Sequence, residues 1–307
     1  MQESASNCSA SEIVDRLYVK YYENNRYSEE TSSHWRKYGE YQKVAKLDGV
    51  WSMSGVGFGD YAPTTLARKI FYLPTSIYLY FMLRLADRGI VRLARSLATR
   101  VGRMFSYDIA RNILTSELLK RYSGGFEGKT IAIIGDGYGA LGSLLKAMFP
   151  TARVIYINLG RTLLFDVFYT ALAFPSLDHK LISDTDMPLS NDFSYVEAEG
   201  VRKVMVEADL FINIASMQEM NPDAISEYFS IMRSQRGGTL FYCCNRIKKE
   251  LPDGAISKFV DYGWRDSDEV LLDELCPWHQ HAPKNRPPFV YRFDGPIQHR
   301  LVRMESL

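Results

Sequence analysis

The sequence TIAIIGDGYGALGSLLKAMF, residues 130–149, decides the fold of this chain. It begins with a short apolar run rich in β-branched residues, passes through a glycine-rich turn and continues with apolar residues at helical spacing. The turn contains Gly135, Gly137 and Gly139, each separated from the next by one residue. A strand, a tight glycine turn and a helix in this order are typical of the first unit of an α/β domain that binds a nucleoside or a dinucleotide.

The chemistry of a nucleoside site explains the glycines. The backbone has to turn sharply and pass close to the ligand, and a Cβ there would either fill the ligand's space or force a strained φ. The amino end of the following helix offers N–H groups to a polar or anionic part of the ligand. The turn is therefore the predicted cofactor site, although an ordinary strand-to-helix turn would also use glycine.

Composition narrows the class of protein. The 307 residues are 46% hydrophobic and 24% charged, which is typical of a globular protein with a large core. A net charge of +1 gives no reason to expect a nucleic-acid partner. The amino-terminal residues lack a signal-peptide pattern, and the longest apolar run, 70–83, is too short to cross a bilayer. We therefore expect a cytoplasmic protein with no transmembrane segment.

The four cysteines, Cys8, Cys243, Cys244 and Cys276, show no spacing typical of a zinc site. Adjacent Cys243 and Cys244 lie in a strand-like run, where cysteine usually serves as a small core residue. We therefore predict no metal site.

The chain divides into two regions. Residues 1–125 show helical periodicity, with a last helix that is expected to begin after Ser106 and to end at Gly124. This helical region would act as a lid, a substrate-binding region or an oligomerisation region, with a homodimer formed through its helices. Residues 126–307 would form the cofactor-binding domain.

The second region alternates between strands and helices. Strand-like runs occur at 130–134, 153–158, 179–183, 209–214 and 239–245, and helical patterns separate them. Such alternation predicts a parallel sheet covered by helices on both faces. Near the end of the chain, residues 288–292 and 299–304 are strand-like and are expected to form an antiparallel hairpin.

Two further features of the first region suggest contact with a substrate. Residues 34–61 are rich in aromatic residues and glycine and are expected to form a loop, in which Trp51 and Tyr61 would close over a bound substrate. A basic stripe lies opposite the apolar face of the next helical stretch. It is either a solvated face or a contact for a phosphorylated substrate or an anionic lipid, and its members are Arg84, Arg88, Arg92, Arg95 and Arg103.

The glycine register distinguishes between two cofactors. Residues 137–142 form a literal GxGxxG, which would suggest NAD(P). The first glycine after the strand is Gly135, however, and the sequence GDGYG that starts there is the form common in enzymes that use S-adenosylmethionine (SAM). From these residues the chain resembles the class I SAM-dependent methyltransferases.

More narrowly, the chain resembles the sugar O-methyltransferase family. The likeness covers about residues 125–307 and depends on four phrases: IIGDGYGALG (133–142), FINIASMQEM (211–220), FYCCNR (241–246) and FDGPIQHRLVRM (293–304). It implies an α/β fold with a Rossmann-like, seven-stranded, mostly parallel sheet and an antiparallel C-terminal hairpin. It also implies that methyl is transferred from SAM to a hydroxyl of a sugar or of a sugar-containing small molecule.

The resemblance implies a set of cofactor-binding positions. The turn residues would line the methionine and ribose, Asn158 and Leu159 would meet the ribose and adenine, and Asp184 would accept from the adenine amino group. Ala215 and Ser216 would follow the fourth strand at the ligand-binding edge of the sheet. The turn residues concerned are Gly135, Asp136, Gly137, Tyr138 and Gly139.

Two positions depart from the family's pattern. Asn158 occupies the place where such enzymes carry an acid that accepts both ribose hydroxyls, and Ile133 replaces another acid. An amide can still accept one hydrogen bond and donate another.

The methyl transfer needs a base that removes the hydroxyl proton. Glu219 follows the fourth strand and is the first candidate, and His279 is the second because imidazole titrates near neutral pH. The predicted substrate-binding residues are Trp51, Tyr61, Gln218, Asn245 and Arg246. Two alternatives stay open at this point: an NAD(P)-dependent oxidoreductase, and a non-catalytic scaffold that keeps the methyltransferase fold.

Overall fold

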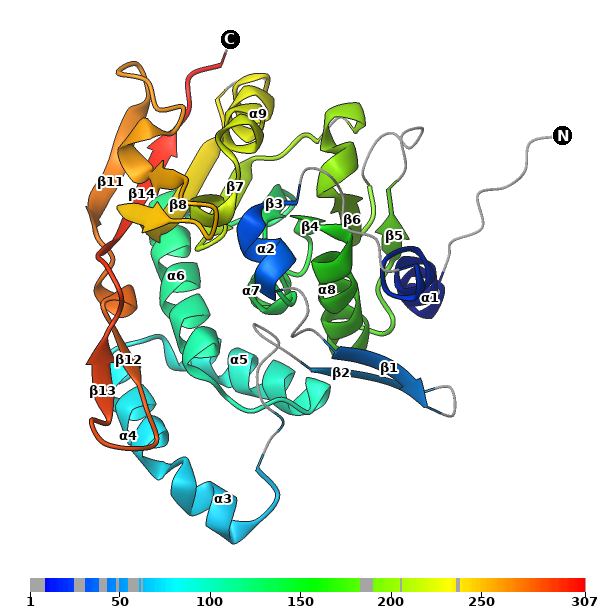
Figure 1. Ribbon diagram of the computed structural model, residues 1–307, viewed down its shortest axis with the longest axis vertical. Coiled ribbons are helices and arrows are strands. Elements are labelled where there is room, and N and C mark those ends of the chain that lie inside the picture. Colours follow the sequence, from blue (N-terminus) through cyan, green and yellow to red (C-terminus); the bar gives the residue numbers. More distant parts are fainter. Residues whose placement is uncertain are drawn as a thin grey trace, which may run out of the picture.

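The computed structural model describes residues 9–24, 31–38, 43–47, 50–54, 61, 63–182, 190–204, 206–235 and 238–306. Its centre is an eight-stranded sheet in the order β11-β14-β8-β7-β3-β4-β6-β5 (Figure 1). The strands are β3 (Thr130–Ile134), β4 (Arg153–Asn158), β5 (His179–Leu181), β6 (Phe193–Glu197), β7 (Leu210–Ile214), β8 (Leu240–Arg246), β11 (Glu269–Leu275) and β14 (Ile297–Arg303).

The described residues also form helices and three small antiparallel strand pairs. The helices are α1 (Ala10–Tyr18), α2 (Ser33–Tyr38), α3 (Leu66–Phe71), α4 (Leu73–Met82), α5 (Arg88–Val101), α6 (Tyr107–Ser123), α7 (Ala140–Met148), α8 (Gly160–Ala173) and α9 (Pro222–Arg233). The antiparallel pairs are β1 (Lys43–Leu47) with β2 (Val50–Ser54), β9 (Lys248–Glu250) with β10 (Ile256–Lys258), and β12 (His281–Pro283) with β13 (Val290–Arg292).

The strand order reverses at β3. The chain passes from β3 to β4 and β6 on one side and then returns to β7 and β8 on the other, with all these pairs parallel. Such a reversal opens a crevice at the carboxyl ends of the strands. The last strand, β14, runs antiparallel between β8 and β11. The predicted Rossmann-like sheet with a reversed strand is therefore confirmed. The sheet has eight strands instead of the predicted seven, because the short strand β5 adds to β6 at one edge.

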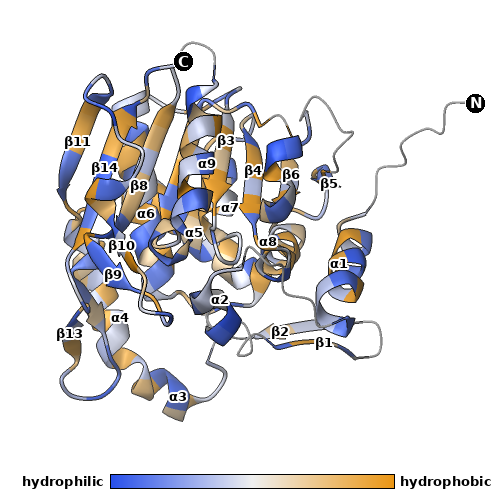
Figure 2. Ribbon diagram, turned by 45° about the horizontal axis from the view of Figure 1, so that its top comes forward, coloured by the Kyte–Doolittle hydropathy of each residue, from blue (hydrophilic) through white to orange (hydrophobic). Residues whose placement is uncertain are grey.

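Both faces of the sheet are covered. Alternate residues of β3 belong to two separate cores: Ile131 and Ile133 face one, and Ala132 and Ile134 face the other. The first core includes buried residues of α1, α5, α6, α7 and α8, and the second includes those of α9. The central strands are accordingly apolar along much of their length (Figure 2). This double burial explains the continuous apolar runs from which the strands were predicted.

The predicted hairpin of residues 288–304 is wrong in its first strand. Residues 290–292 form β13 and pair with β12, whereas β14 pairs with β11. Opposite charges stand across the β11–β14 ladder, Glu269 against Arg303 and Asp273 against Arg300. The second pair forms an ion pair with an N–O distance of 2.6 Å, so charge complementarity favours this partner.

Two other predictions need correction. The third strand of the sheet is β6, which lies between β4 and the short edge strand β5, whereas the sequence placed this strand at 179–183. The described part of residues 34–61 forms α2 and the β1–β2 hairpin instead of one continuous loop. The last helix of the first region is confirmed: Ser106 Oγ accepts a bond from the Ile109 N–H, and Gly124 ends the helix with a φ of 73°.

The basic stripe is not uniformly solvated. Arg103 is 5% exposed, donates to the Met53 carbonyl at 2.8 Å and stacks over the Tyr61 ring at 4.0 Å. Arg95 lies over Phe105 at 4.4 Å. Among the described residues, no helix combines the length and the apolar character that crossing a bilayer would require.

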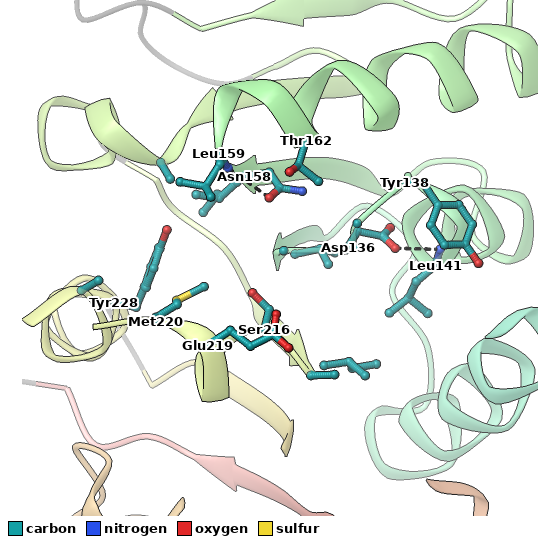
Figure 3. A pocket seen from close by; sticks show the side chains of 18 of the residues that line it. Asp136, Tyr138, Leu141, Asn158, Leu159, Thr162, Ser216, Glu219, Met220 and Tyr228 are labelled. Carbon is teal, nitrogen blue, oxygen red and sulfur yellow. Dashed lines mark hydrogen bonds between the residues drawn. The ribbon is translucent and has the colours of Figure 1, made fainter. Parts of the chain in front are cut away.

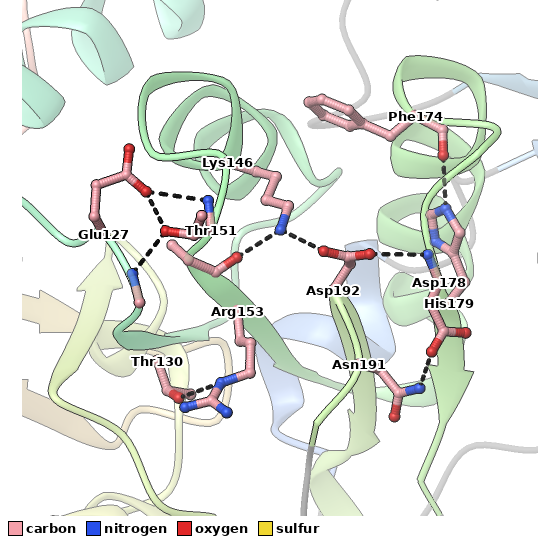
Figure 4. A network of polar contacts seen from close by, with 12 residues as sticks. Glu127, Thr130, Lys146, Thr151, Arg153, Phe174, Asp178, His179, Asn191 and Asp192 are labelled. Atoms are coloured by element: carbon pink, nitrogen blue, oxygen red, sulfur yellow. Dashed lines mark hydrogen bonds and ion pairs between the residues drawn. The ribbon is translucent and has the colours of Figure 1, made fainter.

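A polar network ties the amino ends of the strands together, at the edge opposite the crevice (Figure 4). Lys146 of α7 donates to the Ala152 carbonyl at 2.7 Å and to Asp192 at 2.5 Å. The Lys146 side chain is 2% exposed, while Asp192 is 34% exposed. Burial alone would raise the pKa of Asp192, but the hydrogen bonds from Lys146 and from the Asp178 N–H outweigh it and lower that pKa.

We expect Lys146→Met to lower the free energy of unfolding by about 1 to 3 kcal/mol at neutral pH, because Asp192 loses its charged partner. A carboxyl whose pKa is lowered by folding stabilises the folded state above its ordinary pKa of about 4, and this stabilisation is lost as the pH falls. The difference between variant and parent should therefore shrink in acid, which chemical denaturation at several pH values measures. The control is Lys258→Met, which breaks an exposed pair with Asp261 and should change stability little. Equal losses in the two variants would contradict this account.

Candidate functional site

A cavity of about 360 Å³ lies at the carboxyl ends of the parallel strands, beside the reversal at β3. Its sheet side consists of residues at or just after the ends of β3, β4, β6 and β7. These are Ile133, Gly135, Asp136, Gly137, Tyr138, Ile157, Asn158, Leu159, Ala198, Val201, Ile214, Ala215 and Ser216. The helical side includes Asp108, Arg111 and Asn112 of α6, Leu141 of α7, Thr162 of α8, and Ala224, Glu227 and Tyr228 of α9. Ser32, Glu219, Met220 and Asn221 complete the lining.

The glycines of the turn meet different neighbours. Gly135 has a φ of 74°, and a Cβ there would lie 2.1 Å from Ser216 Oγ. The turn after β3 therefore has to be glycine for the turn after β7 to approach it. A Cβ on Gly139 would lie 2.9 Å from the Asp166 carbonyl of α8, whereas one on Gly137 would meet no atom within 4 Å. Gly137 thus leaves open space at the cavity, as a cofactor cradle requires.

Asp136 holds the turn against α7. Its carboxylate accepts a hydrogen bond from the Leu141 N–H at 3.3 Å (Figure 3) and another from the Gly142 N–H at 3.0 Å. An acid at the amino end of a helix is stabilised by these donors and by the helix dipole. Burial nevertheless raises the pKa of Asp136 to about 6, and the backbone hydrogen bonds only partly oppose it. Through its two hydrogen bonds to the α7 backbone, the Asp136 side chain fixes the turn that lines the cavity.

Asn158 at the end of β4 is held by two hydrogen bonds. Its Nδ2 donates to Asp166 Oδ2 at 2.9 Å, and its Oδ1 accepts from the Leu159 N–H at 3.0 Å. Asp166 is fully buried, and burial, followed by the charge of Asp136, raises its pKa well above the usual range. These contacts fix the amide where it faces the cavity beside Thr162 (Figure 3).

The turn after β7 contains a residue with a strained backbone conformation. Ala215 has a φ of 56°, the one positive φ of a non-glycine residue in the described part of the chain. Its N–H donates to the Cys244 carbonyl at 2.8 Å, which holds this conformation. Residues kept in this region cost free energy and occur at sites that need a defined backbone. Both Ala215 and Ser216, which the resemblance assigns to cofactor binding, line the cavity.

Glu219 lines the cavity from the 3₁₀ turn Met217–Glu219 and is held by two basic side chains. Lys249 forms a short ion pair with its Oε1, and His34 Nε2 lies 3.1 Å from its Oε2. Burial raises the pKa of Glu219, although the charge and hydrogen bond of Lys249 oppose it. Burial, followed by the charges of Lys249 and Arg246, lowers the pKa of His34 to about 4. This lowered pKa favours the uncharged imidazole, whose Nε2 lies within hydrogen-bond distance of the Glu219 carboxylate.

Several predicted site residues are brought together here, and others are not. The cavity lining contains Gly135, Asp136, Gly137, Tyr138, Asn158, Leu159, Ala215, Ser216 and Glu219. Of the remaining predicted residues, Asp184 lies outside the described residues, and Gly139 forms the N-cap of α7 without lining the cavity.

The predicted substrate-binding residues contact other parts of the protein. Gln218 and Asn245 are buried: Gln218 accepts from the Arg246 N–H at 2.8 Å, and Asn245 donates to Asn213 at 2.8 Å. Trp51 packs edge-on against Tyr18, with ring centroids 4.8 Å apart, and Tyr61 stacks on Arg103. In the described part of the chain, none of these predicted residues lines the cavity.

His279 also lies away from the cavity, in the 3₁₀ turn Pro277–His279. Its side chain is buried, which lowers its pKa, and its Nδ1 faces the sulfur atoms of two cysteines. A residue buried in this way does not reach a substrate in the cavity.

The cavity residues of α6 were not predicted from the sequence. Arg111 and Asp108 form an ion pair at the cavity wall, and Asn112 lines the cavity next to them. Their i, i+3 and i, i+4 spacing shows that they share a helix face, but nothing in the sequence says that this face meets the glycine turn. His34 was missed for the same reason, because its partner Glu219 is far away in the sequence.

No family model and no curated protein matches the chain. Among solved structures it is similar to the pyocyanin biosynthetic protein PhzM, with 13% identity, 64% of this chain and 56% of that chain covered, and a TM-score of 0.41. TrmN from Thermus thermophilus is 13% identical, with 64% of this chain and 49% of that chain covered and a TM-score of 0.39. The mitomycin 7-O-methyltransferase MmcR is 12% identical, with 85% of this chain and 79% of that chain covered and a TM-score of 0.40. The chain thus spans about half the length of PhzM and TrmN. At such identities and TM-scores these likenesses carry no argument about what the site binds, so its assignment depends on the geometry of this chain.

Proposed function

We propose that this protein is a SAM-dependent methyltransferase that methylates a hydroxyl group of a sugar or of a sugar-containing small molecule. The observation that carries the proposal is the cavity beside the Gly135 turn, at the strand reversal of a sheet whose last strand runs antiparallel. The sequence resemblance associates this sheet and the GDGYG turn with SAM.

The lining fits the parts of SAM. Gly137 leaves room for the ligand at the turn, and Arg111 offers a guanidinium group for the methionine carboxylate. Asn158 and the Thr162 hydroxyl are placed to bond the ribose. Apolar side chains near the end of β4 and the start of α9 suit an adenine ring; they include Leu159 and Met220 (Figure 3). Val201, in the turn after β6, adds to this apolar lining. Bound SAM would supply a methyl group on a positively charged sulfur.

The residues of this chain would then act on the acceptor. Glu219 would accept the proton of the hydroxyl as the methyl group is transferred. His34 and Lys249 would hold the Glu219 carboxylate in place and are positioning residues. Asp136 would keep the turn in shape through its bonds to the α7 backbone.

The first region, residues 1–125, would cover the acceptor. In support of this role, Ser32 and three residues of α6 line the cavity. A homodimer through the N-terminal helices stays a prediction. It would be supported by apolar side chains of α3 and α4 that are about half exposed or more: Leu66, Ile70, Leu73, Ile77 and Phe81.

Thermal unfolding with added ligands tests the cofactor. A ligand at 100 times its Kd stabilises the folded state by about 2.7 kcal/mol, so SAM and S-adenosylhomocysteine should raise the Tm. Stabilisation by NADH or NADPH alone would instead support an oxidoreductase, and no response to any of these ligands would support a scaffold. Release of S-adenosylhomocysteine with a panel of glycosides, nucleotide sugars and phenols then tests the acceptor class.

A further inference from the structure

Two cysteines and a histidine meet inside the protein, away from the cavity. Cys244 comes from β8, Cys276 follows β11, and His279 ends the 3₁₀ turn after it. All three side chains are buried, and their ligand atoms lie within 4.8 Å of one another. The sequence shows no zinc spacing because only Cys276 and His279 are close along the chain, and the sheet pairing brings Cys244 to them.

The distances match those around one metal ion. His279 Nδ1 lies 3.1 Å from Cys276 Sγ and 3.7 Å from Cys244 Sγ. With bonds of about 2.3 Å to sulfur and about 2.0 Å to nitrogen, these separations correspond to angles of about 90° and about 120° at a shared zinc ion. Both angles are compatible with a tetrahedral site after small side-chain movements.

The loop that carries two of the ligands is held in place. The Gln280 side chain donates to the carbonyls of Cys276, at 2.8 Å, and Ile297, at 2.9 Å. The His279 N–H donates to the Cys276 carbonyl at 3.2 Å, and Tyr107 of α6 donates to the Trp278 carbonyl at 2.7 Å. The ligands are therefore oriented by bonds that do not involve the metal, as a well-defined metal site requires.

We propose that Cys244, Cys276 and His279 bind one zinc ion in the folded protein. Two thiolates and an imidazole are soft and borderline ligands that favour zinc over calcium or magnesium. Three protein ligands leave one tetrahedral position, which a water molecule fills in sites of this type. The ion links β8 to the loop after β11 and so stabilises the packing of this loop against the sheet.

The test is the metal content of the full chain purified without chelators after growth with zinc. We expect inductively coupled plasma mass spectrometry to find about one zinc ion per chain. Removal of the zinc by a strong chelator should lower the Tm. Replacement of the zinc by cobalt(II) should give the absorption of a tetrahedral thiolate complex. Each of Cys244→Ser, Cys276→Ser and His279→Asn should lower the zinc content about tenfold or more.

Cys243→Ser is the matched control. Cys243 is the next residue of the same strand and is equally buried, but it belongs to the core on the other face of the sheet. It should keep its zinc, so a loss specific to the other three variants separates binding from general damage. The cobalt spectrum of the unaltered chain keeps the test valid if a variant fails to fold. The proposal is overturned if zinc-supplied chain holds less than about a tenth of an ion, if Cys276→Ser binds as much as the parent, or if peptide mapping finds Cys244 and Cys276 joined in a disulfide.

Discussion

Gly135→Ala is expected to abolish detectable SAM binding, with a loss in affinity of about a hundredfold or more. The added Cβ would lie 2.1 Å from Ser216 Oγ, and the residue has a φ of 74°. Left-handed backbone costs alanine about 1 to 2 kcal/mol, and overpacking costs about 1 to 3 kcal/mol more. To relieve the contact, the turns after β3 and β7 have to move apart, and both of them line the cavity. Isothermal titration calorimetry measures the binding, and thermal unfolding shows how much of the chain stays folded.

Gly128→Ala controls for the free-energy cost of placing alanine in a left-handed backbone conformation. Gly128 has a φ of 70°, almost that of Gly135, but a Cβ there would meet no atom within 4 Å, and it is not among the residues that line the cavity. We expect this variant to lose only the left-handed penalty and to bind SAM normally. Addition of Ser216→Gly to Gly135→Ala should restore part of the binding, because it removes the atoms that collide. Normal SAM binding by Gly135→Ala itself would show that the turn does not hold the cofactor.

Glu219→Gln is expected to lower kcat by about 10² to 10⁴, the usual contribution of a general base. The amide keeps the size of the side chain but does not accept the hydroxyl proton at neutral pH, so SAM binding should change little. Glu227→Gln is the control, because Glu227 also lines the cavity and is paired with Arg202 instead of Lys249. Equal rates for Glu219→Gln and the parent would remove Glu219 from the mechanism.

The pH profile distinguishes the base from its positioning residues. Burial raises the pKa of Glu219, so the rate should rise with pH through a value above the ordinary glutamate pKa of about 4.3. Lys249→Met removes the charge and the hydrogen bond that oppose the raised pKa of Glu219. The ascending limb of its pH–rate profile should therefore move to higher pH. Glu219→Gln should lose the limb. A limb that stays at the same pH in Lys249→Met would show that Lys249 has only a structural role.

The sequence alone determined the parts of the fold that depend on neighbouring residues. The predicted strands 130–134 and 153–158 coincide with β3 and β4, because these strands are buried on both faces and their apolar runs are continuous. The glycine turn was equally clear, since three glycines with positive φ follow one another in a few residues. The caps of α6 were also local, at Ser106 and Gly124.

Strands that depend on distant partners were predicted poorly. β6 contains Ser194 and Glu197 within its five residues, which breaks the apolar run, and its burial comes from β4 and β5 on either side. β11 is a largely exposed edge strand with three acidic residues, and its partner is selected by Arg300 and Arg303 of β14. In both cases the pairing energy comes from residues that the local pattern does not contain.

The site residues also divide into those that the sequence placed and those that only the tertiary structure brought together. From sequence we could place the glycine turn, Asn158 and Glu219 at the carboxyl ends of strands, because strand ends of a parallel sheet share one edge. Only the tertiary structure brought Arg111 to the cavity, His34 to Glu219, and Cys244 to Cys276 and His279. Each of these contacts joins segments far apart in the chain, and packing of the helices and pairing of the strands decide which side chains meet.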